Sequence, residues 1–190
     1  MKKTILLALA VLAVCACGQK KTDPIADAIV AEMMKDIDQP YKIDIDHLEK
    51  LDSTSFATEF KRRISIYNIR LDQNTARMEK YIREGKSTNA TRMFEALQRD
   101  TRIYNELNVI KENMADDTLK TAYYDYSFVY SGKVGKQRIP RKLAYATITP
   151  DGRVLTYAAD RKDIHKAAGL AIPGYKELLD SFKENEPEEE

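Results

Sequence analysis

The longest regular pattern in this chain of 190 residues is an apolar stripe that begins near Ser55 and continues to about Arg83. Its apolar side chains recur in alternating steps of four and three residues, and Asn74 fills the single gap. The stripe consists of Phe56, Phe60, Ile64, Tyr67, Leu71, Met78 and Tyr81. This spacing predicts one long helix with a single buried face. We expect Asn74 to fix the helix register or to meet another buried polar group.

A second long helix is predicted from about Ala90 to Met114, after a break at Glu84–Ser87 in which Gly85 suits a helix C-terminus. Its apolar side chains form a broad face of Met93, Leu97, Tyr104, Leu107, Ile110 and Met114. Because the connection between the two helices is short, they should pack as an antiparallel hairpin.

The hydrophobic period then changes from that of a helix to that of a strand. Alternating patterns predict strands over Thr121–Tyr130, Leu143–Ile148 and Val154–Ala158. The turn Thr149–Gly152 connects the last two as a hairpin. We interpret Ser131–Lys142 as a long basic link between the first two.

Shorter signals flank these elements. Asp23 and Pro24 suit the start of a helix that ends before Pro40. Tyr41–Asp46 alternates as an edge strand would. Asp46 has capping-box spacing with Glu49, which indicates a short turn over His47–Leu51. A terminal helix is expected over Pro173–Phe182.

Helices followed by a run of strands predict an α+β fold. In detail we expect a long antiparallel helical hairpin, then a three-stranded antiparallel β-meander, then a C-terminal helix, with the hairpin and the last helix covering one face of the sheet. These elements would form one domain over residues 25–183. The acidic segment 184–190 has the composition of a disordered tail.

The N-terminal segment has the features of an export signal. Lys2 and Lys3 precede the apolar run Ile5–Val14, which is too short to span a membrane. Both cysteines of the chain, Cys15 and Cys17, follow this run. Alternative roles as a redox pair or a metal site are disfavoured, since the remaining chain offers no other cysteine and only two histidines.

The sequence Val14-Cys15-Ala16-Cys17 resembles the lipobox of bacterial lipoproteins. The resemblance implies removal of residues 1–16 and attachment of diacylglycerol, and usually an acyl chain such as palmitate, to Cys17. Residues 17–24 would then be a lipidated tether. Gly18 stands where an Asp would retain an enterobacterial lipoprotein in the inner membrane, which implies the outer membrane and leaves its periplasmic or surface face open.

Composition narrows the class of partner. The chain has 31 Lys and Arg against 30 Asp and Glu, and loss of Lys2 and Lys3 keeps it close to neutral. A nucleic-acid-binding protein would need an excess of basic residues, so no nucleic acid is expected as a partner. No cofactor or metal motif is present.

Two groups of residues are candidate ligand sites. Tyrosines on one strand face offer flat apolar rings with polar ends, which suit a glycan or another flat ligand. The basic link could bind an anionic partner such as lipid headgroups. This candidate ligand site comprises Tyr124, Tyr126, Tyr130, Lys136 and Arg138. Alternatively, the tyrosines form a core face and the link is a solvated loop.

Further candidate residues lie elsewhere in the chain. Ser53 and Thr118 lie in patterns that resemble bacterial O-glycosylation acceptors, which would require both to lie in loops. His47 and His165 are far apart in sequence, and no spacing supports a carboxylate pair of Asp125 with Asp151 or Asp160. No catalytic residue is therefore predicted.

Three functions remain open: a non-catalytic interaction or structural module that contacts another envelope protein, a binder of glycans or small ligands, and an enzyme of unknown type. The membrane itself is an expected partner through the N-terminal lipid. The first function is our preferred hypothesis.

Overall fold

The computed structural model of the chain describes residues 23–183. It is mixed helix and antiparallel sheet, so the predicted α+β class is confirmed. The helices are α1 (Pro24–Met34), α2 (Phe56–Arg83), α3 (Ser87–Met114) and α4 (Tyr175–Lys183), with the 3₁₀ helices η1 (Ala115–Leu119), η2 (Arg161–Asp163) and η3 (Ala168–Ala171). The strands are β1 (Tyr41–Ser55), β2 (Thr121–Val134), β3 (Gln137–Ile148) and β4 (Val154–Ala158). The lipidation prediction at Cys17 and the tail at 184–190 lie outside the described residues.

The sheet has four strands in the order β1-β2-β3-β4, so the predicted three-stranded meander is wrong by one strand. The additional strand, β1, contains the expected Tyr41–Asp46 strand but also His47–Leu51, which the capping-box pattern wrongly indicated as a turn. The register of β1 on β2 shifts between Ile45 and His47 and again between Lys50 and Asp52. Each shift is a bulge that reverses the alternation of side chains, so the sequence pattern of one strand resembles two short pieces.

The basic link predicted over Ser131–Lys142 is also wrong, because strand pairing continues through most of it. The last pair of the β2–β3 hairpin is Val134 with Gln137. Gly135 occupies the first central position of the turn with φ 55°, where a two-residue turn of the type II′ class favours glycine. Its amide donates to the carbonyl of Pro40 at 2.7 Å, which attaches the turn to the loop before β1.

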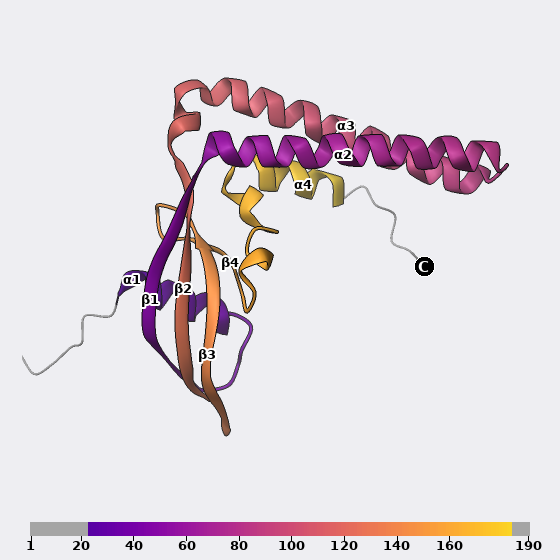
Figure 1. Cartoon of the computed structure of the whole chain (residues 1–190). Helices are drawn as coiled ribbons and strands as arrows, with labels where there is room; N and C mark the ends of the chain where they lie inside the picture. Colours follow the sequence, from indigo (N-terminus) through magenta and orange to yellow (C-terminus); the bar gives the residue numbers. More distant parts are fainter. Residues whose placement is uncertain (1–22, 184–190) are drawn as a thin grey trace, which may run out of the picture.

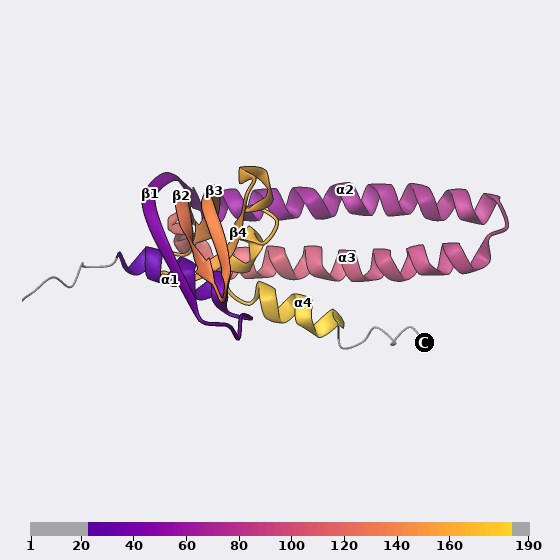
Figure 2. The ribbon, with the colours of Figure 1, turned by 90° about the horizontal axis from the view of Figure 1, so that it is seen from below.

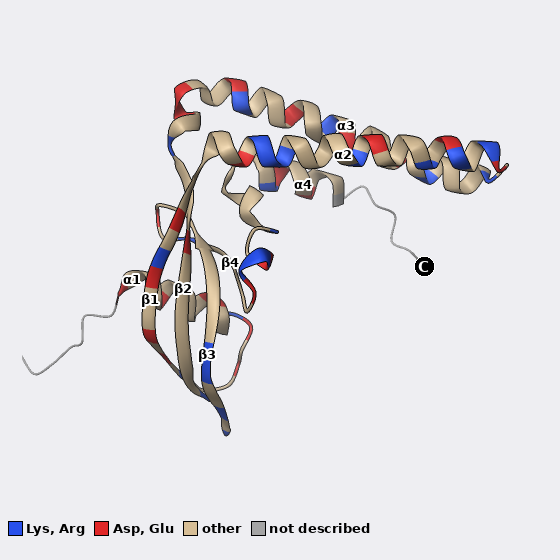
Figure 3. Cartoon of the chain, in the orientation of Figure 1, with Lys and Arg blue, Asp and Glu red and all other residues tan. Residues whose placement is uncertain are grey.

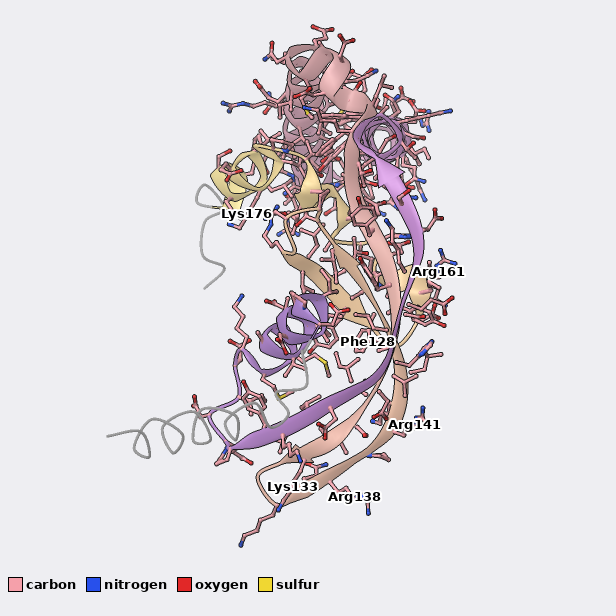
Figure 4. The ribbon with its side chains drawn as sticks, turned by 90° about the vertical axis from the view of Figure 1, so that its left-hand side faces the viewer. Phe128, Lys133, Arg138, Arg141, Arg161 and Lys176 are labelled. Atoms are coloured by element: carbon pink, nitrogen blue, oxygen red, sulfur yellow. The ribbon has the colours of Figure 1, made fainter. Side chains whose placement is uncertain are left out.

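Helix α1 covers one face of the sheet. Ile29 is fully buried against Phe128, Ala144, Ala146 and Ile148. Figure 4 shows Phe128 on the side of the sheet that faces α1, with Arg141 and Arg161 on the opposite side. The expectation that the hairpin and the last helix cover a sheet face is therefore wrong.

The predicted helical hairpin is confirmed, and we call α2 and α3 together the arm. Figures 1 and 2 show the arm lying across the end of the sheet and projecting beyond α4. Its base is held by a hydrophobic cluster of Phe60, Tyr67, Ile103, Leu107, Ile172 and Tyr175. This cluster reaches only Tyr67 on α2 and starts at Ile103 on α3. We call residues 71–97, which lie beyond it, the distal arm.

Gly132 is required for the close approach of β1 to β2. A Cβ atom at this position would lie 2.1 Å from the carbonyl oxygen of Lys42 and 2.9 Å from Cα of Ile43. Both contacts are to backbone atoms, so a side chain can be accommodated only if the two strands move apart.

We therefore predict that Gly132→Ala lowers the free energy of unfolding by about 1–3 kcal/mol, the usual cost of overpacking. Urea denaturation measures this change. Gly85→Ala is the control, since Gly85 has φ 70° but no atom within 4 Å of the added carbon, and it should cost about 1 kcal/mol. Equal losses in the two variants would contradict the proposed clash.

Candidate functional site

The arm joins the sheet through a buried charged cluster centred on Glu59. Glu59 is fully buried in the first turns of α2. Its Oε1 atom accepts a hydrogen bond from Arg63 Nε at 2.6 Å, and its Oε2 atom accepts one from the hydroxyl of Tyr123 on β2 at 3.0 Å. Arg62 Nη1 donates to Glu59 Oε2 at 3.3 Å and to the hydroxyl of Tyr123 at 2.9 Å. Helical spacing brings both arginines beside the carboxylate.

Arg63 extends this cluster to the segment that follows η2. Its Nη2 atom donates to the carbonyl of His165 at 2.7 Å and its Nη1 atom to the carbonyl of Lys166 at 3.3 Å. A Cβ atom on Gly169 would lie 2.6 Å from Arg63 Nε, so glycine leaves the space that the guanidinium occupies. One arginine thus connects α2 with two backbone carbonyls more than 100 residues away in sequence.

Tyr123 supplies the contact between the sheet and the cluster. Burial raises the pKa of its hydroxyl to about 12, and the neighbouring charge of Glu59 acts in the same direction. The hydroxyl therefore keeps its proton at neutral pH and donates to Glu59. This donor role is structural, since each of its partners belongs to the fold itself.

A second polar group lies next to this cluster on the face of the sheet opposite α1. His165 Nε2 lies 2.8 Å from Oδ2 of the buried Asp125. Thr147 Oγ1 is 3.3 Å from Asp125 Oδ1, and Arg161 Nη2 is 3.8 Å from Asp125 Oδ2. Asp125 is thus paired with a histidine and an arginine and not with Asp151 or Asp160.

A His–Asp pair can orient a general base, but general-base catalysis of acyl transfer also requires a nucleophile beside the imidazole. Among residues 23–183, His165 has no hydrogen bond to a Ser, Cys or Lys side chain. Asp160 instead accepts from the amide of Lys162 at 3.0 Å and caps η2, and Asp151 lies in the β3–β4 turn. The contacts of the pair hold the segment after η2 against the sheet.

A separate polar layer lies between the two helices of the arm. Asn74 Nδ2 donates to Asp100 Oδ2 at 3.2 Å, so Asn74 does meet a buried polar group, one of its two predicted roles. Arg70 Nη2 lies 2.9 Å from Asp100 Oδ1, but Oδ1 has no partner with hydrogen-bond alignment. Burial raises the pKa of Asp100, and the opposing effect of Arg70 is smaller.

The predicted ligand residues do not form one site. Tyr126 and Tyr130 pack against the cluster beneath α1, and burial raises the pKa of Tyr126. Tyr124 lies near the arm, where Lys50 Nζ is 3.4 Å from the centre of its ring. Lys136 in the β2–β3 turn and Arg138 on β3 lie at the opposite end of the sheet, since Arg138 pairs with Lys133, about 30 Å from Tyr124 along β2. The prediction grouped these five residues because they are close together in sequence.

The predicted O-glycosylation acceptors lie in regular structure. Ser53 is exposed within β1, so its expected position in a loop is wrong. Thr118 lies in η1, and its hydroxyl donates to the carbonyl of Ala115 at 2.8 Å. His47 is exposed on β1 and lies 3.7 Å from Glu49. Modification of Ser53 or Thr118 stays a prediction.

Two open cavities lie on the described surface. The first, of about 390 Å³, is lined by Phe56, Tyr124, residues of the β3–β4 turn and Ala171. The second, of about 690 Å³, lies between the start of α1 and β1, and its lining includes Asp23, Asp27, Asp44, Asp46 and Ser131. Over residues 23–183 there is no group of three or more side chains positioned to hold a metal ion.

Comparison with known proteins does not assign this chain to a family. No protein-family model, curated protein or solved structure matches this chain. None of the helices within residues 23–183 is both long and apolar enough to cross a membrane.

We predict that Glu59→Gln lowers the free energy of unfolding by about 3–5 kcal/mol, because it leaves the buried Arg63 without its carboxylate. Chemical denaturation followed by circular dichroism measures the change. Tyr123→Phe, which removes one hydrogen bond, should cost about 1–3 kcal/mol. Glu106→Gln on the exposed side of α3 is the matched control. An effect of Glu59→Gln no larger than that of the control would refute the proposed joint.

We predict a distinct pH dependence for Asp100. Its folded-state pKa is raised, so protonation favours the folded state, and the stabilisation present below about pH 4 is lost as pH rises through the folded pKa. Relative to Asp100→Asn, the wild-type chain should therefore lose stability between pH 4 and neutrality. Thermal denaturation of both proteins across this range measures the difference. A relative gain in stability with rising pH would instead show that the ion pair with Arg70 dominates.

Proposed function

We propose that this protein is a lipid-anchored lipoprotein of the bacterial cell envelope and acts as a non-catalytic interaction module. In this proposal, Cys17 holds the chain at the membrane, and the sheet holds the arm away from it. The distal arm then contacts another envelope protein.

The observation that carries this proposal is the arm itself. Each helix has 28 residues and is therefore about 42 Å long. The cluster that attaches the arm to the rest of the fold ends at Tyr67 and Ile103, so about half of each helix lies beyond it. Ile82 and Phe94 on the distal arm are 61% and 51% exposed. An extension of this length that adds little to the core is best explained by contact with a partner.

The joint at the base of the arm supports the same proposal. A cluster of buried charges with directional hydrogen bonds fixes the orientation of a helix more narrowly than apolar packing does, because each bond has a preferred geometry. The contacts of Glu59, Arg63 and Tyr123 therefore suit an arm that has to be presented in one direction.

The cavity beside Tyr124 favours a second candidate function, the binding of a small ligand. Its volume of about 390 Å³ lies within the range of small-molecule sites. Its charged neighbours already have internal contacts, since Lys120 pairs with Asp117 at 2.8 Å and Arg153 lies 3.4 Å from the carbonyl of Leu170. The cavity thus offers few free polar groups to orient a ligand, which makes this the weaker candidate.

A photo-crosslinking amino acid introduced at Ile82 or Phe94 tests the proposal in the native envelope. We expect both positions to give the same discrete cross-linked protein, identified by mass spectrometry. Leu119 is the control position, since it is 77% exposed but lies in η1 at the base of the arm. It should not give that product.

A shortened arm provides the second comparison. Deletion of residues 76–82 together with 92–98 removes one heptad from each helix and shortens the arm by about 10 Å, while it keeps Asn74, Asp100 and the connecting turn. We expect this variant to fold, as circular dichroism would show, and to lose the partner. Because the deletion also removes both cross-linking positions, loss of the partner is measured by co-purification from the envelope. The proposal would be contradicted if neither distal position gave a cross-linked product, or if Leu119 gave the same product as they do.

A further inference from the structure

The end of the sheet farthest from the arm carries a row of like charges. Lys42 on β1 lies directly opposite Lys133 on β2, and Lys133 lies directly opposite Arg138 on β3. Side chains that are directly opposite share one face of a sheet, and like charges in such pairs are destabilising. The stability of the fold therefore does not explain why three cations occupy adjacent positions.

Other basic side chains extend this row, and we call the whole group the sheet tip. It comprises Lys42, Lys133, Lys136, Arg138 and Lys142, all of them exposed. Figure 3 shows the blue of Lys and Arg at this end of the sheet, whereas both signs alternate along the arm. From Tyr126 to Ile148 the chain contains no Asp or Glu.

Acidic residues near the sheet tip do not neutralise it. Asp46 lies 3.7 Å from Arg141, which is outside the group. Asp36 and Asp38 lie on the loop before β1, and Asp44 lies on β1 opposite Ser131. Within the part of the chain that the structure describes, no carboxylate lies within ion-pair distance of any of the five sheet-tip cations.

The backbone of the sheet tip is well defined by its contacts. Gly132 permits the close approach of β1, and the hydrogen bond from Gly135 to Pro40 attaches the turn to the preceding loop. The cations are therefore displayed on paired strands and not on a free loop. Figure 4 shows Lys133 and Arg138 together at this end.

The expected membrane anchor precedes α1, whose start lies beside the middle of β1 (Figure 1). Asp23, the first described residue, lines the same cavity as Ser131, which is two positions from Lys133. Asp23 is six positions after Cys17, so the chain between them reaches at most about 21 Å. A tether of this length from the middle of the sheet would allow the sheet tip to reach the membrane surface.

We propose that the sheet tip docks on an anionic membrane surface through lipid headgroups. A negatively charged surface attracts basic residues that lie close to it, and each such contact strengthens binding by about five-fold. Headgroup phosphates would also relieve the repulsion in the row of Lys42, Lys133 and Arg138. The arm starts at the other end of β2, a strand about 45 Å long. With the sheet tip docked, the arm would therefore lie about 45 Å from the membrane.

Sedimentation with lipid vesicles tests this proposal. The protein used is the chain from residue 17 onward with Cys17→Ser, which carries no lipid. We expect it to bind vesicles that contain phosphatidylglycerol and not to bind vesicles of phosphatidylcholine alone. Binding should weaken as the salt concentration rises. The test is independent of the proposed partner of the arm, because cross-linking at Ile82 can fail while vesicle binding succeeds.

The decisive comparison is between two variants with the same change in charge. Lys133→Glu, Lys136→Glu and Arg138→Glu together should weaken vesicle binding at least about 100-fold. Arg77→Glu, Arg83→Glu and Arg92→Glu on the distal arm should leave it within about three-fold of the parent, and circular dichroism confirms that each variant is folded.

Three results would overturn the proposal. One is failure of the parent protein to bind anionic vesicles at low salt. Another is an equal loss of binding in both variants, which would reflect net charge alone. The third is displacement by inorganic phosphate beyond the effect of chloride at equal ionic strength, which would indicate a site for a soluble anion.

Discussion

A carboxylate removed from water is stable only where cations and hydrogen bonds replace that water, and Glu59 depends on three different parts of the chain for them. Arg63 comes from its own helix, Tyr123 comes from β2, and the carbonyls that orient Arg63 come from the segment after η2. The cluster can form only when all three parts are in place. The orientation of the arm relative to the sheet follows from this requirement, and apolar packing at the base of the arm adds stability to an arrangement that the charged contacts define.

The fold separates two surfaces of different character. The sheet tip is basic and lies at one end of β2, whereas the arm starts at the other end and carries mixed charge (Figure 3). The sheet between them is a spacer whose length is set by the 14 residues of β2. This separation gives a physical basis for a protein that would contact a membrane at one end and another macromolecule at the other. A small-ligand site would need neither the spacer nor the distal arm.

The sequence predicted the elements whose periodicity is uninterrupted. The stripe from Phe56 to Tyr81 defined α2, and alternation defined much of β2. The length of β1 could not be predicted, because bulges after Ile45 and Lys50 reverse its alternation. The Gly135 turn was a local signal that could have identified the β2–β3 hairpin within the basic segment. Tyr123, the partner of Glu59 on the sheet, is 64 residues away in sequence, and no local pattern indicates that contact.

The most direct measurement is the distance between the two ends of the molecule in solution. Spin labels on Thr88→Cys at the end of the arm and Gln137→Cys beside the sheet tip report this distance by pulsed electron paramagnetic resonance, in the chain from residue 17 onward with Cys17→Ser. A joint fixed by Glu59 predicts a single narrow distance distribution that broadens in the Glu59→Gln variant. A broad distribution in the parent chain, unchanged by Glu59→Gln, would show that the arm is hinged and would contradict the account.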